Sequence, residues 1–354
     1  MNNGDFYEKI YSHPDGRTLP VSGSIELTAR CNLNCVHCYI NHPEMCQTTL
    51  GKELTCGEIC ALVDQIAEAG CLKLTLTGGE ALLRNDFVSI LRHVKDQGII
   101  PTLFTNGTLI TPSLADAFYD LAFSAVEITI PGATPETFDA ITRVPGSHRK
   151  CLQGVELLRA RGISVRLKTT VTTMNKSEIP VIQKFAQELG VEFRFDTRIM
   201  PRIDGSLQPC SYRLSPAEIV ELDAIREGEA PDDETQGPAP GQQGHDSVYR
   251  CYSVIRHSFW IDSFGNLSLC HTSRDPCLSL REHSFAAARK ELISMILSMK
   301  PSGTNGCAGC DLKSICENCA ALSLLELGDR ESPVPFCCET AQLRALARQG
   351  AARA

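Results

Sequence analysis

Apolar residues between positions 24 and 197 recur with two alternating periods. In Lys73–Thr77 every second residue is apolar, which predicts a strand, and in Phe87–Gln97 the apolar residues have helical spacing. The period of two also predicts strands at Ser24–Thr28, Pro101–Thr105, Ala125–Ile130, Ser164–Thr172 and Glu192–Thr197. The helical period also predicts helices at Glu53–Ala69, Pro112–Leu121, Pro135–Thr142, Cys151–Arg161 and Ile179–Leu189. The region therefore contains six strand–helix units.

Alternating strands and helices require right-handed crossovers onto a parallel sheet, so we expect an α/β fold. The pattern alone fits both a doubly wound sheet and a barrel of parallel strands. Capping residues support two helix starts, because Thr55 with Glu58 and Ser215 with Glu218 have the spacing of a capping box. In either architecture the loops at the carboxyl ends of the strands are the usual place for an active site.

The apolar periodicity is lost between Glu227 and Asp246, a stretch rich in Pro, Gly, Gln and Asp. Such a composition indicates a linker or a surface loop. We therefore expect an N-terminal extension at 1–20, an α/β domain at 21–226, a linker at 227–249, a smaller Cys-rich and loop-rich domain at 250–340, and a C-terminal helix or tail at 341–354 within an Ala- and Arg-rich stretch from Thr340.

The chain of 354 residues has 43% hydrophobic residues and a net charge of −8, which suit a globular enzyme and argue against a nucleic-acid partner. The first 20 residues lack the apolar core of a signal peptide, and we find no segment suited to crossing a membrane. We expect a cytoplasmic protein. In that reducing compartment the 18 cysteines favour metal binding or catalysis over a disulfide framework.

Three cysteines, Cys31, Cys35 and Cys38, follow the first predicted strand within eight residues. A [4Fe–4S] cluster is usually held by cysteine thiolates, so three protein ligands leave one iron open to another molecule. The alternative is a zinc site, but zinc prefers four ligands, commonly from two separated Cys-x2-Cys pairs. We expect the chemistry of the protein at the open iron.

The run C-x3-C-x2-C followed by Tyr39 resembles the signature of the radical SAM superfamily. The resemblance implies a partial (β/α)6 barrel of parallel strands, with the cluster loop after the first strand and S-adenosylmethionine (SAM) bound to the open iron. It also implies SAM-binding residues, namely Tyr39, Gly78, Gly79 and Glu80 of a GGE motif, Asn106 of a TNG motif, and Thr129. Taken alone, the GGE and TNG motifs would be common turns.

The C-terminal cysteines resemble the SPASM extension of radical SAM peptide maturases, which binds two auxiliary [4Fe–4S] clusters. The family pattern implies one cluster on Cys251, Cys270 and Cys319 and another on Cys307, Cys310, Cys316 and Cys338. Relatives usually have three residues where Cys316 and Cys319 are separated by two. The alternative is a zinc ribbon on Cys307, Cys310, Cys316 and Cys319, but its central gap would be short and three cysteines would stay unexplained.

Two departures from the family pattern bear on the chemistry. The chain has no cysteine between Cys251 and Cys270, so the first auxiliary cluster would keep an open iron unless Cys277 or Cys337 closes it. Anaerobic sulfatase maturases carry an aspartate base just after the second SPASM cysteine, where this chain has His271. An imidazole can accept a proton near neutral pH, although a structural histidine is the common alternative.

Two charged residues on the predicted strands are further candidates. Asp196 ends the sixth strand and points by position toward the barrel mouth, where it could act in catalysis, although solvation or capping would equally explain it. Lys168 lies on the fifth strand and could equally be a surface charge.

The resemblance implies an enzyme that cleaves SAM reductively to a 5′-deoxyadenosyl radical and modifies a ribosomally made peptide or protein by hydrogen-atom abstraction, forming a thioether or another crosslink or oxidation. The similar stretches include Phe193–Asp196 and Pro201–Gly205. Alternatives are a haem-pathway enzyme that modifies a tetrapyrrole side chain, a sulfatase-maturase-like oxidase, and an iron–sulfur electron-transfer scaffold. Expected partners are a peptide or protein substrate, a flavodoxin- or ferredoxin-type electron donor, and a separate protein for any leader peptide.

Overall fold

The computed structural model of the chain describes residues 19–40, 42–43, 46–123, 125–226, 247–251, 256–303, 307 and 309–351. The predicted linker at 227–249 lies outside the described residues except for its last three positions. Of the N-terminal extension predicted at 1–20, only Leu19 and Pro20 are described.

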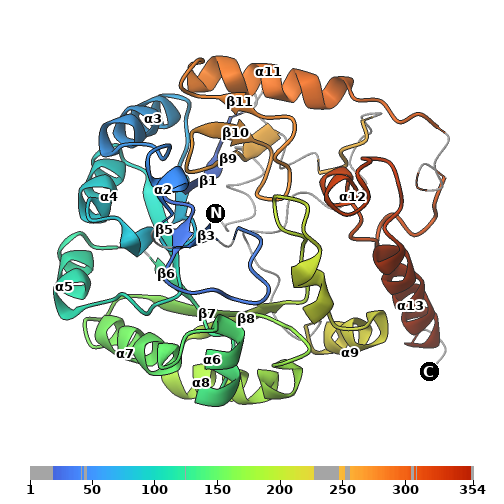
Figure 1. Cartoon of the computed structure of the whole chain (residues 1–354), viewed down its shortest axis with the longest axis horizontal. Coiled ribbons are helices and arrows are strands. Elements are labelled where there is room, and N and C mark those ends of the chain that lie inside the picture. The colour runs from blue at the N-terminus through green and yellow to red at the C-terminus, as the bar shows by residue number, and fades with distance from the viewer. Residues whose placement is uncertain are drawn as a thin grey trace, which may run out of the picture.

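Six parallel strands form the centre of the molecule (Figure 1). Their order in the sheet follows the sequence: β1 (Ser22–Glu26), β4 (Lys73–Thr77), β5 (Ile100–Thr105), β6 (Ala125–Thr129), β7 (Val165–Thr170) and β8 (Glu192–Asp196). Each pairs with its neighbour in parallel register. The predicted partial barrel is confirmed, and its strand bounds agree with the sequence pattern to within two residues.

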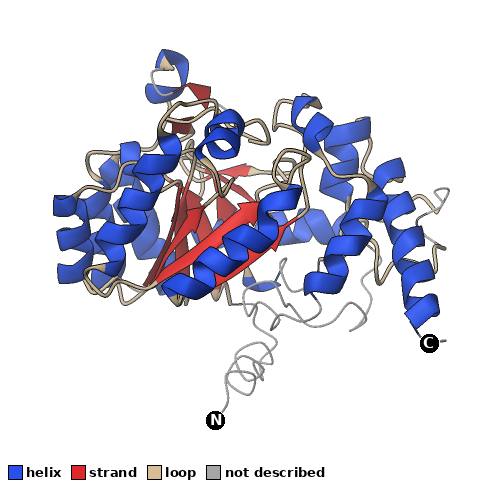
Figure 2. Ribbon diagram, turned by 90° about the horizontal axis from the view of Figure 1, so that it is seen from below, coloured by secondary structure: helices blue, strands red, loops and turns tan. Residues whose placement is uncertain are grey.

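Helices cover the outer face of this sheet (Figure 2). They are α3 (Cys56–Glu68), α4 (Phe87–Asp96), α5 (Pro112–Asp120), α6 (Pro135–Thr142), α7 (Ser147–Arg159) and α8 (Ile179–Leu189). The predicted capping box of α3 is present, since Glu58 N donates to Thr55 Oγ1 and Thr55 N donates to Glu58 Oε2. Short 3-10 turns at Ala81–Leu83 (η1), Lys176–Glu178 (η2) and Gln208–Tyr212 (η3), and α9 (Pro216–Arg226), complete this part.

Side chains on the barrel strands alternate between an apolar outer face and a polar inner face. The outer positions pack against the helices and are fully buried; they include Ile25, Leu76, Leu103, Val126 and Leu167. The inner positions include Glu26, Thr77, Glu127, Lys168 and Arg194. Closed barrels of parallel strands fill their interior with branched apolar residues. The polar interior of this open barrel is suited to holding ligands.

The C-terminal part continues the same sheet. β9 (Trp260–Ile261) pairs in parallel with β1, and β10 (Asn266–Ser268) and β11 (Leu278–Ser279) follow in antiparallel order to give nine strands. A small parallel pair, β2 (Arg30–Cys31) and β3 (His42–Pro43), and the short helix α2 (Gln47–Leu50) lie after β1. The division into a barrel domain and a Cys-rich domain remains a prediction, although one apolar core includes residues of both.

Among the described residues of the Cys-rich part and the tail lie α11 (Phe285–Ser298), α12 (Ala320–Leu327) and α13 (Pro335–Ala351). The first two are not among the elements predicted from the sequence, and α13 begins five residues before the predicted Thr340. An ion pair between Arg344 and Asp223 at 2.6 Å connects α13 to α9. Arg213, after η3, likewise pairs with Glu326 of α12.

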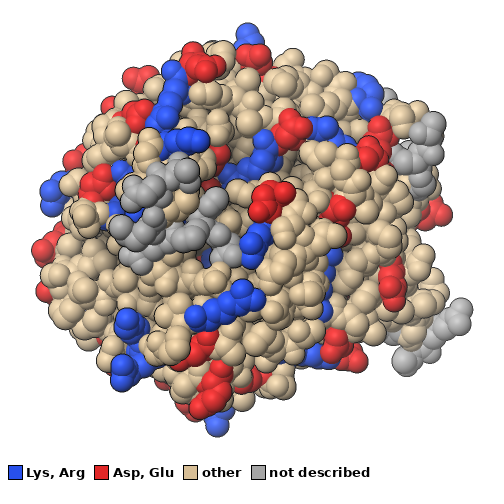
Figure 3. Space-filling model, in the orientation of Figure 1, with Lys and Arg blue, Asp and Glu red and all other residues tan. Residues whose placement is uncertain are grey.

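The visible face in Figure 3 carries acidic and basic side chains side by side. Among the described residues, no helix is both long enough and apolar enough to cross a bilayer.

Gly23 of β1 allows close contact between the barrel and the C-terminal part, because a Cβ there would lie 2.0 Å from Cζ of Phe259. The Phe259 ring in turn packs edge-on against Phe285 of α11. We expect Gly23→Ala to lower the free energy of unfolding by about 1–3 kcal/mol, the usual effect of overpacking. Thermal unfolding of purified protein measures the change.

Gly57→Ala is the matched control. No atom lies within 4 Å of a Cβ at this position in α3, and alanine stabilises a helix by roughly 0.5–1 kcal/mol relative to glycine. A G23A midpoint equal to that of the wild type would contradict the contact with Phe259.

Candidate functional site

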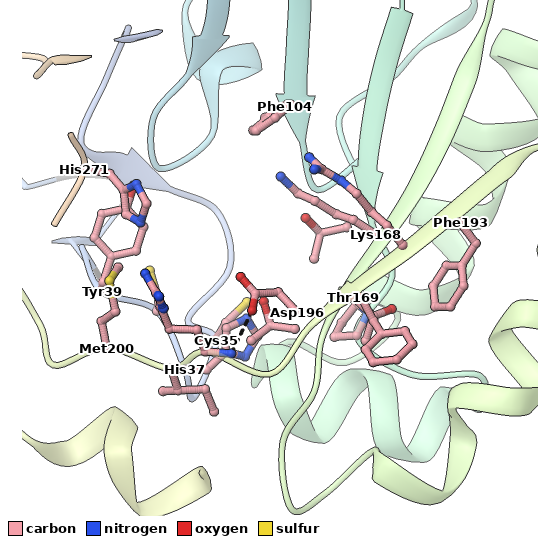
Figure 4. Close-up of a pocket in the computed structure, with 18 of the residues that line it drawn as sticks. Cys35, His37, Tyr39, Phe104, Lys168, Thr169, Phe193, Asp196, Met200 and His271 are labelled. Carbon is pink, nitrogen blue, oxygen red and sulfur yellow. Dashed lines mark hydrogen bonds between the residues drawn. The ribbon is translucent and has the colours of Figure 1, made fainter. Parts of the chain in front are cut away.

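A large cavity opens at the carboxyl ends of the barrel strands, with a volume of about 1780 Å³. The barrel contributes Cys31, Cys35, Cys38 and the inner residues of β5 to β8, and the C-terminal part contributes residues such as His271, Cys316 and Arg344. Figure 4 shows His271 and Tyr39 on one side and Lys168 on the other, with Asp196 and Cys35 between them. Both parts of the chain therefore enclose one site.

The cluster loop brings its three thiols close together. Burial, the charge of Glu80 and the charge of Cys38 raise the pKa of Cys31 to about 12. Burial with Cys38 and Cys31 likewise raises the pKa of Cys35 well above its usual value. The loop is fixed to α6, because Asn34 N donates to Thr142 O and Val36 N to Ile141 O. Buried thiols this close would repel one another as thiolates, which a bound metal centre would offset. The three thiols are thus near enough to affect one another electrostatically, and their role as cluster ligands remains a prediction.

Asn106 connects the third strand to this loop. Its Nδ2 donates to Cys31 Sγ at 3.8 Å and to Asn32 Oδ1 at 2.9 Å. Hydrogen bonds to ligand sulfurs tune the reduction potential of an iron–sulfur cluster. Asn106 also lines the cavity, so its position is compatible with the predicted role in SAM binding.

The two glycines of the GGE segment lie at the cavity and in close contact with another backbone segment. Gly78 and Gly79 line the cavity. A Cβ on Gly78 would lie 2.3 Å from Thr28 O, and one on Gly79 would lie 2.2 Å from Arg30 O. The glycines are thus required by the close approach of two backbone segments, and their own backbone remains available for the predicted contact with SAM.

Glu80 is placed differently from its predicted role in SAM binding. Its side chain is buried and lies outside the set of residues that line the cavity. The carboxylate accepts hydrogen bonds from Leu82 N, Thr105 Oγ1 and Asn106 N. In this structure the Glu80 side chain therefore connects the end of β4 to the end of β5.

His271 packs between two aromatic rings on the cavity wall. Its ring lies 5.7 Å from that of Tyr39 and 5.3 Å from that of Trp260, measured between centroids. Burial, with smaller effects of Arg198 and Arg274, lowers the pKa of His271 to about 4. A general base is most effective when its pKa is near the working pH. Its environment therefore favours the structural alternative over the predicted base.

The wall around Tyr39 is held by a buried carboxylate. Tyr39 Oη donates to Glu26 Oε1 at 3.4 Å, and Trp260 Nε1 donates to the same oxygen at 3.0 Å. Arg274 forms an ion pair with Glu26. These contacts fix the orientation of Tyr39, the predicted SAM-binding residue that follows the cluster loop.

The remaining predicted residues of the barrel all reach the cavity. Thr129 at the end of β6 and Asp196 at the end of β8 line it, and Asp196 Oδ1 accepts a hydrogen bond from Arg198 N. Lys168 also lines the cavity, so the surface-charge alternative does not describe its position. Arg194 and Glu127, which the sequence analysis did not single out, lie beside it. The alternation of side chains along β8 and β6 places Arg194 and Glu127 on the inner face, and this alternation is the sequence signal that could have identified them.

Electrostatic effects link some of the C-terminal cysteines to one another. Burial, Cys270 and Cys319 raise the pKa of Cys251 to about 12. Burial with Cys316, Cys307 and Cys310 raises the pKa of Cys338. Among the described residues, no three Cys, His, Asp or Glu side chains meet the geometry of a site for one metal ion. The assignment of the two groups as cluster ligands remains a prediction.

Cys277 and Cys337 occupy different surroundings. Cys277 is exposed as a residue. Partial burial of its thiol, with the nearby Asp262 and Asp275, raises its pKa. Cys337 is buried in a small apolar cluster with Met200, Leu322 and Val334.

The family model of the Radical SAM superfamily matches residues 25–185, from β1 into α8. This matched part is a radical SAM domain, and the chain is a radical SAM enzyme. Such a domain implies a [4Fe–4S] cluster and SAM, for which the cluster loop and the cavity beside it have fitting residues.

Among relatives, the AdoMet-dependent heme synthase of Methanosarcina barkeri is 28% identical in an alignment of 342 positions that covers 88% of this chain and 94% of the relative. The pre-heme d1 synthase of Dinoroseobacter shibae is 34% identical over 47% of this chain and 40% of the relative. The PqqA peptide cyclase of Bradyrhizobium diazoefficiens is 27% identical over 52% of this chain and 48% of the relative. The full-length similarity is thus to a haem synthase.

Two solved structures share the fold over nearly the whole chain. Streptococcus suis SuiB bound to precursor peptide SuiA has a TM-score of 0.69 and 15% identity, covering 95% of this chain and 80% of SuiB. Native anSMEcpe with bound AdoMet has a TM-score of 0.64 and 14% identity, covering 93% of this chain and 98% of anSMEcpe. At these identities the likeness concerns the fold.

We expect the double substitution of Cys31→Ala and Cys35→Ala to abolish binding of the SAM-linked cluster. After anaerobic reconstitution, iron analysis should give about four fewer iron atoms per chain. Cys71→Ala is the control, because this buried thiol lies against Val21 O and Lys73 O and away from the three groups. Equal iron contents in the double variant and the wild type would exclude the loop as a cluster site.

Glu80→Ala should destabilise the protein in the absence of SAM by about 2–4 kcal/mol, because one buried donor and two partly buried donors would lose their acceptor. Thermal unfolding without SAM measures this effect. Glu58→Ala, at the exposed capping box of α3, should cost only about 1 kcal/mol. If Glu80→Ala weakened SAM binding and left the unfolding midpoint of SAM-free protein unchanged, the carboxylate would serve the ligand instead of the two strands.

Proposed function

We propose that this radical SAM enzyme modifies a side chain of a tetrapyrrole. The observation that carries the proposal is the extent of the similarity to the AdoMet-dependent heme synthase, which spans 94% of that relative. The match to the PqqA peptide cyclase spans about half of each chain. A second tetrapyrrole enzyme, the pre-heme d1 synthase, is also similar over the barrel half. This favours the alternative considered from the sequence over peptide maturation.

The size and charge of the cavity support a large anionic substrate. Pockets for drug-sized ligands measure roughly 300–1,000 Å³, and the volume of about 1780 Å³ exceeds this range. Five basic side chains line the cavity, Lys168, Arg194, Arg198, Arg344 and Arg348, beside four acidic ones, Glu192, Asp196, Asp223 and Glu317. Carboxylates on a tetrapyrrole periphery would find cationic partners there.

Bound SAM and its cluster would supply a 5′-deoxyadenosyl radical that abstracts a hydrogen atom from the substrate. The chain positions the reactants: Cys31, Cys35 and Cys38 would hold the cluster, and Gly78, Gly79, Asn106, Thr129 and Tyr39 would surround SAM. The protein's own contribution is orientation and the exclusion of water. The aromatic wall of Tyr39, Trp260 and His271 limits access of solvent from one side.

Two auxiliary [4Fe–4S] clusters complete the proposal, one on Cys251, Cys270 and Cys319 and the other on Cys307, Cys310, Cys316 and Cys338. The mutual pKa effects within each group support this pairing. Three thiols would leave the first of these clusters with one iron open. The exposed setting of Cys277 supports this, whereas Cys337, in an apolar cluster that Cys319 packs against, is the cysteine that would close it. The clusters would accept the electron that the substrate radical releases, and a flavodoxin- or ferredoxin-type protein would reduce the first cluster.

Peptide or protein modification is the second candidate function. The supporting observation is the fold shared with SuiB bound to precursor peptide SuiA and with anSMEcpe, which also has a structure with a bound peptide. Under this reading a thioether or another crosslink or oxidation would form on the peptide, with a separate protein for any leader sequence.

The test uses anaerobically reconstituted enzyme with SAM, dithionite and an iron porphyrin that carries propionate side chains. We expect 5′-deoxyadenosine to form and the mass of the porphyrin to change, both measured by mass spectrometry. The variant with Cys31→Ala and Cys35→Ala should form neither product. SAM cleavage that leaves the porphyrin unchanged, together with modification of a short peptide encoded beside this gene, would favour the second function.

A further inference from the structure

The outer surface beside the cluster loop is basic. Between Ala140 and Val155 the chain contains Arg143, Arg149 and Lys150 but no Asp or Glu, whereas the whole chain has a net charge of −8. All three residues are exposed. We call these three residues the basic surface. On an acidic protein, such a surface is where a negatively charged partner meets the least repulsion.

The carboxylate that precedes this segment is directed at a helix start. Asp139 accepts hydrogen bonds from Gly146 N, Ser147 Oγ and His148 N, at the beginning of α7. It thus satisfies free donors in the first turn of that helix. The basic surface lies around this first turn, since Arg149 and Lys150 are the third and fourth residues of α7.

Hydrogen bonds at Thr142 connect the basic surface to the cluster loop. Thr142 O accepts from Asn34 N at 3.0 Å, and Thr142 Oγ1 shares a hydrogen bond with Ser147 Oγ at 2.7 Å. Arg143 is the next residue along the chain. Burial raises the pKa of Cys35 well above its usual value, and the positive charge of Arg143 opposes this effect. The charge of the basic surface therefore reaches a predicted cluster ligand.

The basic surface lies outside the cavity. Cys35 and Thr142 line the cavity, whereas Arg143, Arg149 and Lys150 are not among the lining residues. The cluster loop and the end of α6 therefore separate the cavity from this surface. A protein docked on the basic surface would approach the cluster loop without competing with SAM or substrate for the cavity.

Arg143 has a backbone conformation that disfavours a side chain. It ends α6 in the left-handed region, with φ 57° and ψ 24°, and Ala122 is the other non-glycine residue with positive φ among those described. Helices that end in this conformation usually have glycine or asparagine there, because a Cβ is crowded. Unfavourable conformations of this kind are frequent at functional sites. A role for the Arg143 side chain at the surface would account for its presence.

We propose that Arg143, Arg149 and Lys150 form the docking surface for an acidic one-electron carrier protein of the flavodoxin or ferredoxin type. The proposal rests on the proposed function, which requires reduction of the cluster on Cys31, Cys35 and Cys38. The carrier would lose one electron and the cluster would gain it, with no covalent bond formed. Complexes of this kind are small, below about 1,200 Å² of buried surface, and their rate of formation depends on complementary charge.

The test uses anaerobically reconstituted enzyme and a flavodoxin of net negative charge. Fluorescence anisotropy of the labelled flavodoxin measures binding, and formation of 5′-deoxyadenosine from SAM measures electron delivery by its hydroquinone form. Reduced methyl viologen, a small cation that needs no docking surface, is the second reductant. Wild-type enzyme should bind flavodoxin at low ionic strength and lose this binding at about 1 M salt, where the Debye length is about 3 Å.

The double variant Arg149→Glu with Lys150→Glu reverses two of the three charges. We expect flavodoxin binding and flavodoxin-driven SAM cleavage at low ionic strength to fall about 10-fold or more. Cleavage driven by methyl viologen should not decrease. Folding should be retained, because glutamates in the first turn of a helix interact favourably with its dipole.

Arg143→Gly separates the charge from the fold. Glycine suits the left-handed position, so the unfolding midpoint should equal or exceed that of the wild type. Flavodoxin binding should nevertheless weaken by about two- to fivefold, the usual effect of one exposed charge pair.

The matched control is Arg92→Glu with Lys290→Glu. These exposed residues lie on α4 and α11, and the two substitutions change the net charge by the same amount. Figure 1 shows α11 at the opposite end of the molecule from α6 and α7. We expect the control to bind flavodoxin within about twofold of the wild type.

The outcomes separate this inference from the proposed function. The inference is wrong if both double variants weaken flavodoxin binding equally, or if the variant at Arg149 and Lys150 slows both reductants alike. It is also wrong if wild-type enzyme cleaves SAM with methyl viologen but neither binds nor accepts electrons from flavodoxin. If flavodoxin-driven cleavage depends on the basic surface while the porphyrin stays unmodified, the tetrapyrrole function fails and the inference stands.

Discussion

The site depends on the contact between two backbone segments that leave adjacent strands. Gly79 N donates to Thr28 O and Glu80 N donates to Arg30 O, both at 2.8 Å. A side chain at Gly78 or Gly79 would prevent this approach. The start of the cluster loop is thereby fixed against the end of β4. The buried Glu80 carboxylate extends the connection to Thr105 and Asn106, and Asn106 returns it to Cys31 through its Nδ2.

A second constraint is the alternation of side chains along the strands. The outer side chains pack against the helices and are apolar. The inner side chains do not face the helices, so they can be polar, and they carry most of the charge of the strands. Glu26 and Glu127 are nearly inaccessible carboxylates on opposite parts of this interior, and each is paired with basic residues. Glu26 with Arg274 orients the aromatic wall. Glu127 holds Lys168 and Arg194 on the inner wall of the barrel.

The sequence predicted the elements that depend on local signals and missed those that depend on pairing across the fold. Strand and helix periods, the Thr55–Glu58 capping box and the spacing of Cys31, Cys35 and Cys38 are local, and the structure reproduces the elements and the cap. The burial of Glu80 depends on donors from β5, and the cluster of Glu127 with Lys168 and Arg194 depends on three strands. No spacing along the chain reveals either. Helix α11 has apolar residues at helical spacing, such as Phe285, Leu292 and Ile296, so a local signal for this helix is present in the sequence.

The pairing of β9 with β1 has a consequence for the order of folding. These strands are neighbours in the sheet, yet Ser24 and its partner Trp260 are far apart in the chain. During synthesis the barrel strands β1 to β8 emerge before β9, so one edge of β1 stays unpaired until the C-terminal part has left the ribosome. An unpaired strand edge is prone to association with other chains. Pairing of β9 with β1 closes the long chain segment between Ser24 and Trp260, and such long-range pairing is slow. The residues after β9, such as His271, then complete the cavity wall.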